Sequence, residues 1–243
     1  MSRRFIVLPT PAAVAEAAAD RIVASARNAI RRRGRCVLAL SGGSTPRGVY
    51  TLLAAPPRAE AVDWSRVEFF WGDERACPPD DPDSNFGLAR ALLLDRLSGI
   101  RAEAVHRMPA DAEDRDRAAS RYQAEIARTF GVPTDASHPP AFDLIWLGIG
   151  RDGHTASLFP GSRALAERRR WVVAVQAPAP AGWRMTFTLP LINVARSVLF
   201  VAAGADKAPA LQAVRSGSRE LPAARVRARS TLWLVDAAAA GTA

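Results

Sequence analysis

Short apolar segments alternate with polar loops and helical stretches along most of this 243-residue chain. Apolar runs at residues 36–40, 67–71 and 142–147 each lead into a loop rich in glycine or polar residues. A continuous apolar run is typical of a strand buried on both faces, as in a parallel sheet covered by its crossover helices. The alternation therefore predicts an α/β fold with a doubly wound, mostly parallel sheet and helices on both faces.

The rest of the chain fits the same organisation. Thr10 and Pro11 provide an N-cap and a first-turn proline for a helix that we expect to end at Gly34. The other expected strands are residues 4–8, 171–175, 184–189, 197–203 and 231–235, and the other expected helices lie at about 86–97, 111–130 and 205–216. The Pro/Ala-rich stretch 176–182 is interpreted as a loop, so residues 1–243 are expected to form a single domain.

Four loops follow expected strands, at residues 41–46, 72–85, 148–154 and 204–207. Ligands of open α/β sheets bind beyond the carboxyl ends of the strands, so these loops should face one crevice. The first of them has the composition of an anion site: its glycines let backbone amides approach a ligand, its hydroxyls can donate, and a helix begins near its end. A plain tight turn is the alternative. The candidate phosphate ligands are Ser41, Gly42, Gly43, Ser44 and Thr45, with Arg75 and Lys207 from other loops.

Asp152-Gly-His154 is the sharpest candidate for catalysis. Histidine titrates near neutral pH, and an acidic neighbour can fix its tautomer, so the pair suits an oriented general base. A structural histidine is the alternative interpretation on spacing alone. The other histidines, His106 and His138, have no polar constellation nearby in the sequence and are expected to be structural or at the surface.

Two glycine-rich patterns resemble nucleotide-binding motifs but lack the residues that complete those motifs. Residues 43–48 have the glycine spacing of a P-loop, but Val49 and Tyr50 replace the Lys and Ser/Thr that bind phosphate and magnesium. Residues 148–153 match G-x-G-x-x-G, yet no acidic residue ends the next strand to bind a ribose. Neither an NTPase nor a nicotinamide enzyme is favoured. No G-x-S-x-G, H-E-x-x-H, paired-cysteine or calcium-loop pattern occurs either.

The charge is +9, from 33 Lys+Arg against 24 Asp+Glu, and all but one of these bases are arginine. The arginines are scattered, and no aromatic-basic RNA motif is present, so we expect no nucleic-acid partner. No apolar run is long enough to span a membrane, and Cys36 and Cys77 are expected to be reduced thiols in a cytoplasmic protein. Lys207 is the only lysine in the sequence and stands out among the basic residues.

Taken together, these loops resemble the 6-phosphogluconolactonase family, within the larger group that includes glucosamine-6-phosphate deaminase. The matching segments, in family order, are LALSGGSTP (38–46), FFWGDERACPPDDPDSNFGLA (69–89), FDLIWLGIGRDGHTASLFPG (142–161), RMTFTLPLINVARSVLFVAAGADKA (184–208) and LPAARVRARSTLWLVDAAA (221–239). They span nearly the whole chain.

The resemblance implies a Rossmann-like domain of the sugar-phosphate isomerase type, and hydrolysis of 6-phospho-D-glucono-1,5-lactone in the oxidative pentose phosphate pathway without metal or organic cofactor. It implies His154 as the general base that activates water and Asp152 as the residue that orients it. The loop at residues 41–45, Arg75 and Lys207 would hold the phosphate. Further implied candidates are Arg184 as a phosphate ligand and Asp73 near the sugar or a loop amide. The expected partner is the phosphorylated sugar lactone, bound by a monomer or homodimer.

The deaminases are the alternative within this group. They resemble the chain in the phosphate loop and the D-G-H, but their motif continues with an acidic residue before the proline, where this chain has Phe159. The absence of that carboxylate favours lactone hydrolysis over sugar ring opening. One position departs from the lactonase pattern: a usual Pro-Lys is Pro178-Ala179 here. A sugar-phosphate sensor that binds without turnover is a third possibility.

Overall fold

The computed structural model describes residues 2–134, 138–218 and 220–242. Six parallel strands form the main sheet, in the order β1-β9-β8-β5-β2-β3. Their bounds are β1 Ser2–Leu8, β2 Cys36–Leu40, β3 Val67–Trp71, β5 Leu144–Leu147, β8 Val198–Ala202 and β9 Ser230–Asp236. Every residue of β2, β5 and β8 is buried, because these inner strands are covered on both faces.

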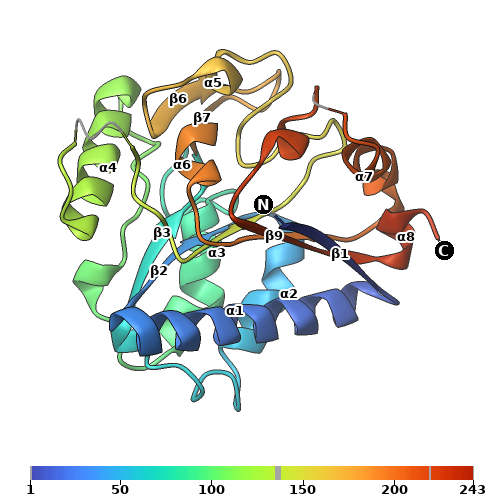
Figure 1. The fold of residues 1–243 in the computed structure, drawn as a ribbon. Coiled ribbons are helices and arrows are strands. Elements are labelled where there is room, and N and C mark those ends of the chain that lie inside the picture. Colours follow the sequence, from blue (N-terminus) through green and yellow to red (C-terminus); the bar gives the residue numbers. More distant parts are fainter. Residues whose placement is uncertain (1, 135–137, 219, 243) are drawn as a thin grey trace.

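Helices cover both faces of this sheet, which confirms the predicted fold class (Figure 1). In the view of Figure 1, α1 and α2 lie below the strands, and α4 and α6 lie above them. The helices are α1 Pro11–Arg33, α2 Ser44–Leu53, α3 Asn85–Leu92, α4 Arg115–Phe130, α5 Arg163–Ala166, α6 Leu189–Asn193, α7 Ala208–Arg215 and α8 Ala237–Ala240. Helix α1 begins and ends as predicted, because the Thr10 side chain accepts from the Ala13 amide and Gly34 ends the helix in a left-handed conformation.

Two of the expected strands lie outside the main sheet. β6 (Val172–Gln176) and β7 (Trp183–Phe187) pair antiparallel, and a short strand, β4 (Asp73–Arg75), pairs with β7. Only six residues, 177–182, connect β6 to β7, whereas a parallel crossover needs about a dozen or more. Residues 72–85 were interpreted as a loop, but they contain the additional strand β4. That residues 1–243 form a single domain stays a prediction.

The strand order reverses between β2 and β5. From β2 the chain moves outward to β3, then returns past β2 to build β5, β8 and β9 on the other side. A reversal of this kind leaves a crevice at the carboxyl ends of the two strands, where ligands of open α/β folds bind. The loops that begin at Ser41 and at Gly148 leave the sheet at this place. No helix in the described part of the chain combines the length and the apolar character that a membrane span requires.

His106 lies in a buried polar cluster that the sequence did not reveal. Its ring stacks on Phe70 at 4.1 Å, Nδ1 lies 2.7 Å from Glu125 and Nε2 lies 2.9 Å from Glu68. Burial alone would lower the pKa of His106, but the hydrogen bonds to the two carboxylates outweigh it and raise the pKa above its ordinary value. The expectation that no polar groups surround this histidine was therefore wrong, while its structural role is supported.

This cluster predicts a pH-dependent contribution to stability. Because the folded-state pKa of His106 is raised, its stabilisation is complete below the unfolded pKa of about 6.5 and is lost as the pH rises through the folded value. The difference in Tm between the wild type and His106→Gln should therefore be larger at pH 6 than at pH 8.5. Thermal unfolding of both proteins at the two pH values measures it. A difference that grows with pH would contradict the assignment.

Candidate active site

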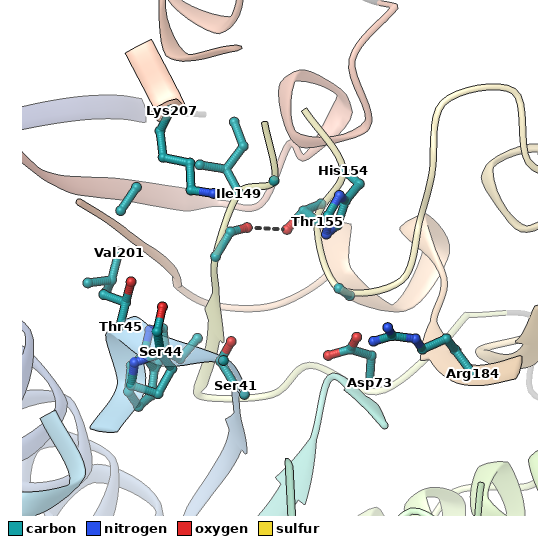
Figure 2. Close-up of a pocket in the computed structure, with 18 of the residues that line it drawn as sticks. Ser41, Ser44, Thr45, Asp73, Ile149, His154, Thr155, Arg184, Val201 and Lys207 are labelled. Atoms are coloured by element: carbon teal, nitrogen blue, oxygen red, sulfur yellow. Dashed lines mark hydrogen bonds between the residues drawn. The ribbon is translucent and has the colours of Figure 1, made fainter. Parts of the chain in front are cut away.

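One cleft lies at the carboxyl ends of the central strands and receives residues from all four loops that were expected to meet there (Figure 2). Its lining residues are Ser41, Gly42, Gly43, Ser44, Thr45, Pro46, Asp73, Arg75, Trp146, Gly148, Ile149, Gly150, His154, Thr155, Ala156, Arg184, Val201, Ala202 and Lys207. The cleft encloses about 220 Å³, below the roughly 300 to 1,000 Å³ typical of drug-sized ligands. That volume suits a phosphorylated monosaccharide better than a dinucleotide.

The loop at residues 41–45 presents the positive end of α2 to this cleft. Gly43 caps the helix without a side-chain hydrogen bond, so first-turn amides remain available to a ligand. The buried Tyr50 donates from its hydroxyl to the Ser41 carbonyl at 2.5 Å, which fixes the start of the loop. At Gly42, an added Cβ would lie 1.6 Å from Asn85 Oδ1. The start of the loop is therefore held in place, and residue 42 has no room for a side chain.

Arg75 and Arg184 are directly opposite each other on β4 and β7. Like charges at opposed positions of an antiparallel pair destabilise it. Burial first, and then the charge of Arg75 among other neighbours, lower the pKa of Arg184 despite the opposing effect of Asp73. The Nε atom of each arginine is buried and has no hydrogen-bond partner among the described residues. Arg75 also donates through Nη1 to the Asp83 carbonyl, and two guanidinium groups side by side are suited to an anion with several acceptor oxygens.

Asp73 and the Arg184 guanidinium point toward each other (Figure 2). Its Oδ2 accepts from the buried Ser157 hydroxyl at 2.6 Å, and Asn85 Nδ2 donates to its backbone carbonyl at 2.8 Å. Asp73 is thereby held by two side chains, and its expected position near the sugar stays a prediction. Lys207 enters from the end of β8, where its Nζ lies 3.0 Å from Asp206. With one carboxylate and three cations among the lining residues, the cleft favours an anionic ligand.

The neighbouring Glu74 is buried behind the cleft. Its carboxylate accepts from the amides of Arg75, Asn85 and Phe86 and from the Ser84 hydroxyl. Burial raises the pKa of Glu74 despite these hydrogen bonds. It therefore anchors the beginning of α3 to β4 and positions Arg75 from behind, and it does not line the cleft.

His154 and Asp152 form a close pair at the cleft. His154 Nδ1 lies 2.5 Å from Asp152 Oδ1, and the His154 amide donates to the same oxygen at 3.1 Å. Burial alone would raise the pKa of Asp152, but the backbone hydrogen bond and the ring of His154 outweigh it and hold the pKa below its ordinary value. An ionised Asp152 keeps the proton on Nδ1 and leaves Nε2 as the basic nitrogen. The ring is 34% exposed, so its basic edge is accessible.

Two glycines make the turn around this pair possible. An added Cβ at Gly150 would lie 2.1 Å from His154 Nδ1 and 2.7 Å from Asp152 Oδ1. Gly153 has a φ of +78°, and a Cβ there would lie 2.8 Å from the Leu221 side chain. Thr155 closes the same turn by donating to the Gly148 carbonyl at 2.9 Å, the dashed line of Figure 2.

Three backbone amides of this turn are already engaged within it. The Gly150 amide donates to the His154 carbonyl, the Gly153 amide to the Gly150 carbonyl, and the His154 amide to Asp152. These three amides are therefore not available as donors to a ligand.

Phe159 occupies the position where the deaminases have an acidic residue. Its ring is nearly buried and lies 4.8 Å, centroid to centroid, from the ring of His154. An apolar ring at this place supplies packing for the histidine and no carboxylate for proton transfer. His154 therefore has an apolar neighbour where the deaminase motif would place an acidic group.

The structure brings nearly all of the predicted site residues to one place. Every predicted residue except Asp152 lines the cleft, and Asp152 contacts His154 directly. Sequence reasoning missed the residues that support them: Tyr50, Glu74, Asn85, Gly150 and Ser157. Gly150 alone carried a signal, as the second glycine of the G-x-G-x-x-G pattern. Within the described residues, no group of three or more His, Cys, Asp or Glu side chains could hold a metal ion.

Comparison with known proteins places these features in a family. Residues 9–233 match the model of a family described as glucosamine-6-phosphate isomerases/6-phosphogluconolactonase. A protein of Streptomyces coelicolor named 6-phosphogluconolactonase is 41% identical over 235 residues, covering 93% of this chain and 89% of that protein. One of the same name from a Nostoc species is 39% identical and covers 98% of both. A solved structure of 6-phosphogluconolactonase from Trypanosoma cruzi superposes with a TM-score of 0.86 at 30% identity, covering 99% of this chain and 96% of that one.

Proposed function

We propose that this chain, which belongs to the glucosamine-6-phosphate isomerase/6-phosphogluconolactonase family, is a 6-phosphogluconolactonase. It hydrolyses 6-phospho-D-glucono-1,5-lactone to 6-phospho-D-gluconate in the oxidative pentose phosphate pathway. One observation carries the proposal. A His–Asp pair and a group of cationic side chains suited to phosphate lie at one cleft of monosaccharide size.

The phosphate binds between the first turn of α2, Arg75, Arg184 and Lys207. Its charge offsets the repulsion between the opposed arginines, and its oxygens accept from amides and guanidinium groups. The sugar ring then extends across the cleft toward His154, with Asp73 beside it. Binding of the remote phosphate positions the reacting carbonyl at the general base.

Hydrolysis begins with attack of water on the C1 carbonyl carbon. His154 Nε2 accepts a proton from the water, and Asp152 stabilises the resulting imidazolium at Nδ1. The oxygen of the carbonyl becomes an oxyanion, which requires hydrogen-bond donors on the His154 side of the cleft, away from the phosphate. When the tetrahedral intermediate collapses, the bond from C1 to the ring oxygen breaks and His154 returns its proton to that oxygen. The product is the open-chain acid, and no metal or covalent intermediate takes part.

An assay on freshly generated 6-phosphogluconolactone tests this function. Acid release above the spontaneous rate is the expected result, and removing the phosphate from the substrate should raise KM strongly because the cationic pocket is then empty. Equal turnover of the unphosphorylated lactone would contradict the phosphate site. Ammonia release from glucosamine 6-phosphate, without lactonase activity, would support the deaminase alternative.

Lys207 provides a charge test of the phosphate pocket. A compact ammonium on a flexible stem and a planar guanidinium are not interchangeable, and Lys207 lies between Asp206 and the cleft. We expect Lys207→Arg to raise KM about 10-fold and Lys207→Met about 100-fold, with kcat little changed, because phosphate binding is uniform between ground and transition states. Steady-state kinetics of the two variants measure the split. A wild-type KM in Lys207→Met would remove Lys207 from the pocket.

A further inference from the structure

A second cavity lies away from the cleft, near the amino ends of β8 and β9. It encloses about 360 Å³ and is lined by Arg168, Leu189, Pro190, Asn193, Arg225 and Arg227. Three of these residues come from α6, before β8, and two come from the segment before β9. The cavity therefore combines an apolar floor, made by Leu189 and Pro190, with three guanidinium groups.

Hydrogen bonds hold the backbone of Arg225 and Arg227 and the side chain of Arg168. Asn193 Oδ1 accepts from the Arg227 amide at 2.6 Å, and its Nδ2 donates to the Arg225 carbonyl at 3.4 Å. Arg168 donates through Nη1 to the carbonyls of Leu165 and Glu167, at 3.3 and 3.0 Å. The backbone on both sides of the cavity is thus fixed, and the remaining guanidinium N–H groups are available to a ligand.

A fourth arginine lies beside this group. Arg3 donates to the carbonyls of Ala224 and Val226, at 3.0 and 3.2 Å. Burial first, and then the charge of Arg227, lower the pKa of Arg3. Arg3 and Arg227 are therefore close enough for their charges to repel each other.

No carboxylate neutralises them. Within residues 2–134, 138–218 and 220–242, Arg3, Arg168, Arg225 and Arg227 have no acidic side chain within the 4.0 Å of an ion pair. The adjacent Glu167 is occupied, because it accepts from backbone amides that follow it and pairs with Arg170.

Some other arginines of the chain are ion-paired. Arg58 pairs with both Glu16 and Asp20, and Arg101 pairs with Glu68 and Glu103. The arginines around the second cavity have no such partner among the described residues, and three of them line one cavity.

We propose that the second cavity is an anion-binding site for a small molecule of the nucleoside diphosphate class. Each guanidinium can donate two parallel hydrogen bonds to a phosphate, so three of them match two linked phosphates better than one. The apolar floor would hold the nucleoside. The site is separate from the active site and does not depend on the proposed reaction.

The same chain segment reaches the catalytic turn. The amide of Ala223 donates to the Gly153 carbonyl at 3.1 Å, and the Leu221 side chain lies against Gly153. Residues 221–227 therefore connect the second cavity to the turn that carries Asp152 and His154.

Thermal unfolding with ADP tests the site. At about 100 times the dissociation constant, ADP should raise the Tm of the wild type by about 5 to 10 °C. The double variant Arg225→Gln/Arg227→Gln should lose this rise. Without ADP it should melt no lower than the wild type, because two repelling charges are gone. If the double variant does not fold, Arg168→Gln, which leaves residues 221–227 unchanged, should show a reduced rise.

Two control variants locate the effect. Arg75→Gln/Lys207→Gln removes two cations from the cleft and should keep the ADP-dependent rise. Arg21→Gln/Arg27→Gln removes two exposed charges from α1, without altering either cavity, and should also keep it. The proposal is overturned if Arg225→Gln/Arg227→Gln retains the full rise or if either control loses it. A rise with inorganic pyrophosphate as large as with ADP would contradict the nucleoside part.

Discussion

Replacing His154 with alanine is expected to lower kcat on 6-phosphogluconolactone by about 10² to 10⁴-fold, the usual contribution of a positioned general base. The affinity for 6-phosphogluconate should change little, because the proposed phosphate ligands lie on other elements of the cleft. The two quantities can be measured separately, by stopped-flow acid release and by calorimetric titration with the product. Turnover within tenfold of the wild type would exclude His154 as the base.

Chemical rescue distinguishes loss of the base from a structural effect. Imidazole added to His154→Ala should restore part of the rate, because it can occupy the space beside Phe159 and accept the proton. Asp152→Asn keeps the shape of the turn but replaces the carboxylate that accepts from His154 Nδ1. It should lower kcat less than His154→Ala does, with product binding preserved.

Replacing Gly150 with alanine is expected to lower kcat by about 10²-fold, although residue 150 has no side chain to take part in the reaction. The new Cβ would lie 2.1 Å from His154 Nδ1, so the ring must move by about 1 Å or more to reach normal contact. A misplacement of this size in a catalytic group costs about 10²-fold in rate. Kinetics together with a crystal structure of the variant would show the displaced ring.

The matched control is Gly48→Ala. A Cβ at Gly48 would meet its nearest neighbour, the Cβ of Ala15, at an ordinary 3.5 Å. Because alanine favours a helix over glycine, this variant should keep wild-type kinetics and unfold at the same or a higher Tm. Wild-type kcat in Gly150→Ala would show that His154 does not need the space at residue 150.

The periodic features of the fold were predictable from local sequence. The buried strands, the limits of α1 and the positions of four ligand loops all follow from patterns within about thirty residues. The antiparallel sheet was not predicted, because assigning β6 and β7 to the main sheet disregarded the shortness of residues 177–182. Nothing in the sequence around residues 73–75 indicated that β4 would pair with a strand about 110 residues later.

The chemical groups of the site were predictable for a related reason. Asp152 and His154, the loop at residues 41–45, Arg75 and Lys207 are each recognised by the residues next to them in the sequence. The supporting groups are not, because each acts through a partner distant in the chain. Ser157 holds Asp73 across 84 residues, and Asn85 fills the space that Gly42 leaves.

The sequence by itself determined the α/β class, the carboxyl-end crevice and the residue types that meet there, because hydrophobic periodicity and loop composition are local properties of the chain. Only the tertiary structure decided that Arg75 opposes Arg184, that Gly150 makes room for His154, and that His106 lies between two glutamates. It also gathered unpaired arginines around a second cavity. These arrangements depend on strand register and on packing between remote segments, and the resulting distances set the charge repulsion, the steric limits and the pKa shifts that local patterns do not contain.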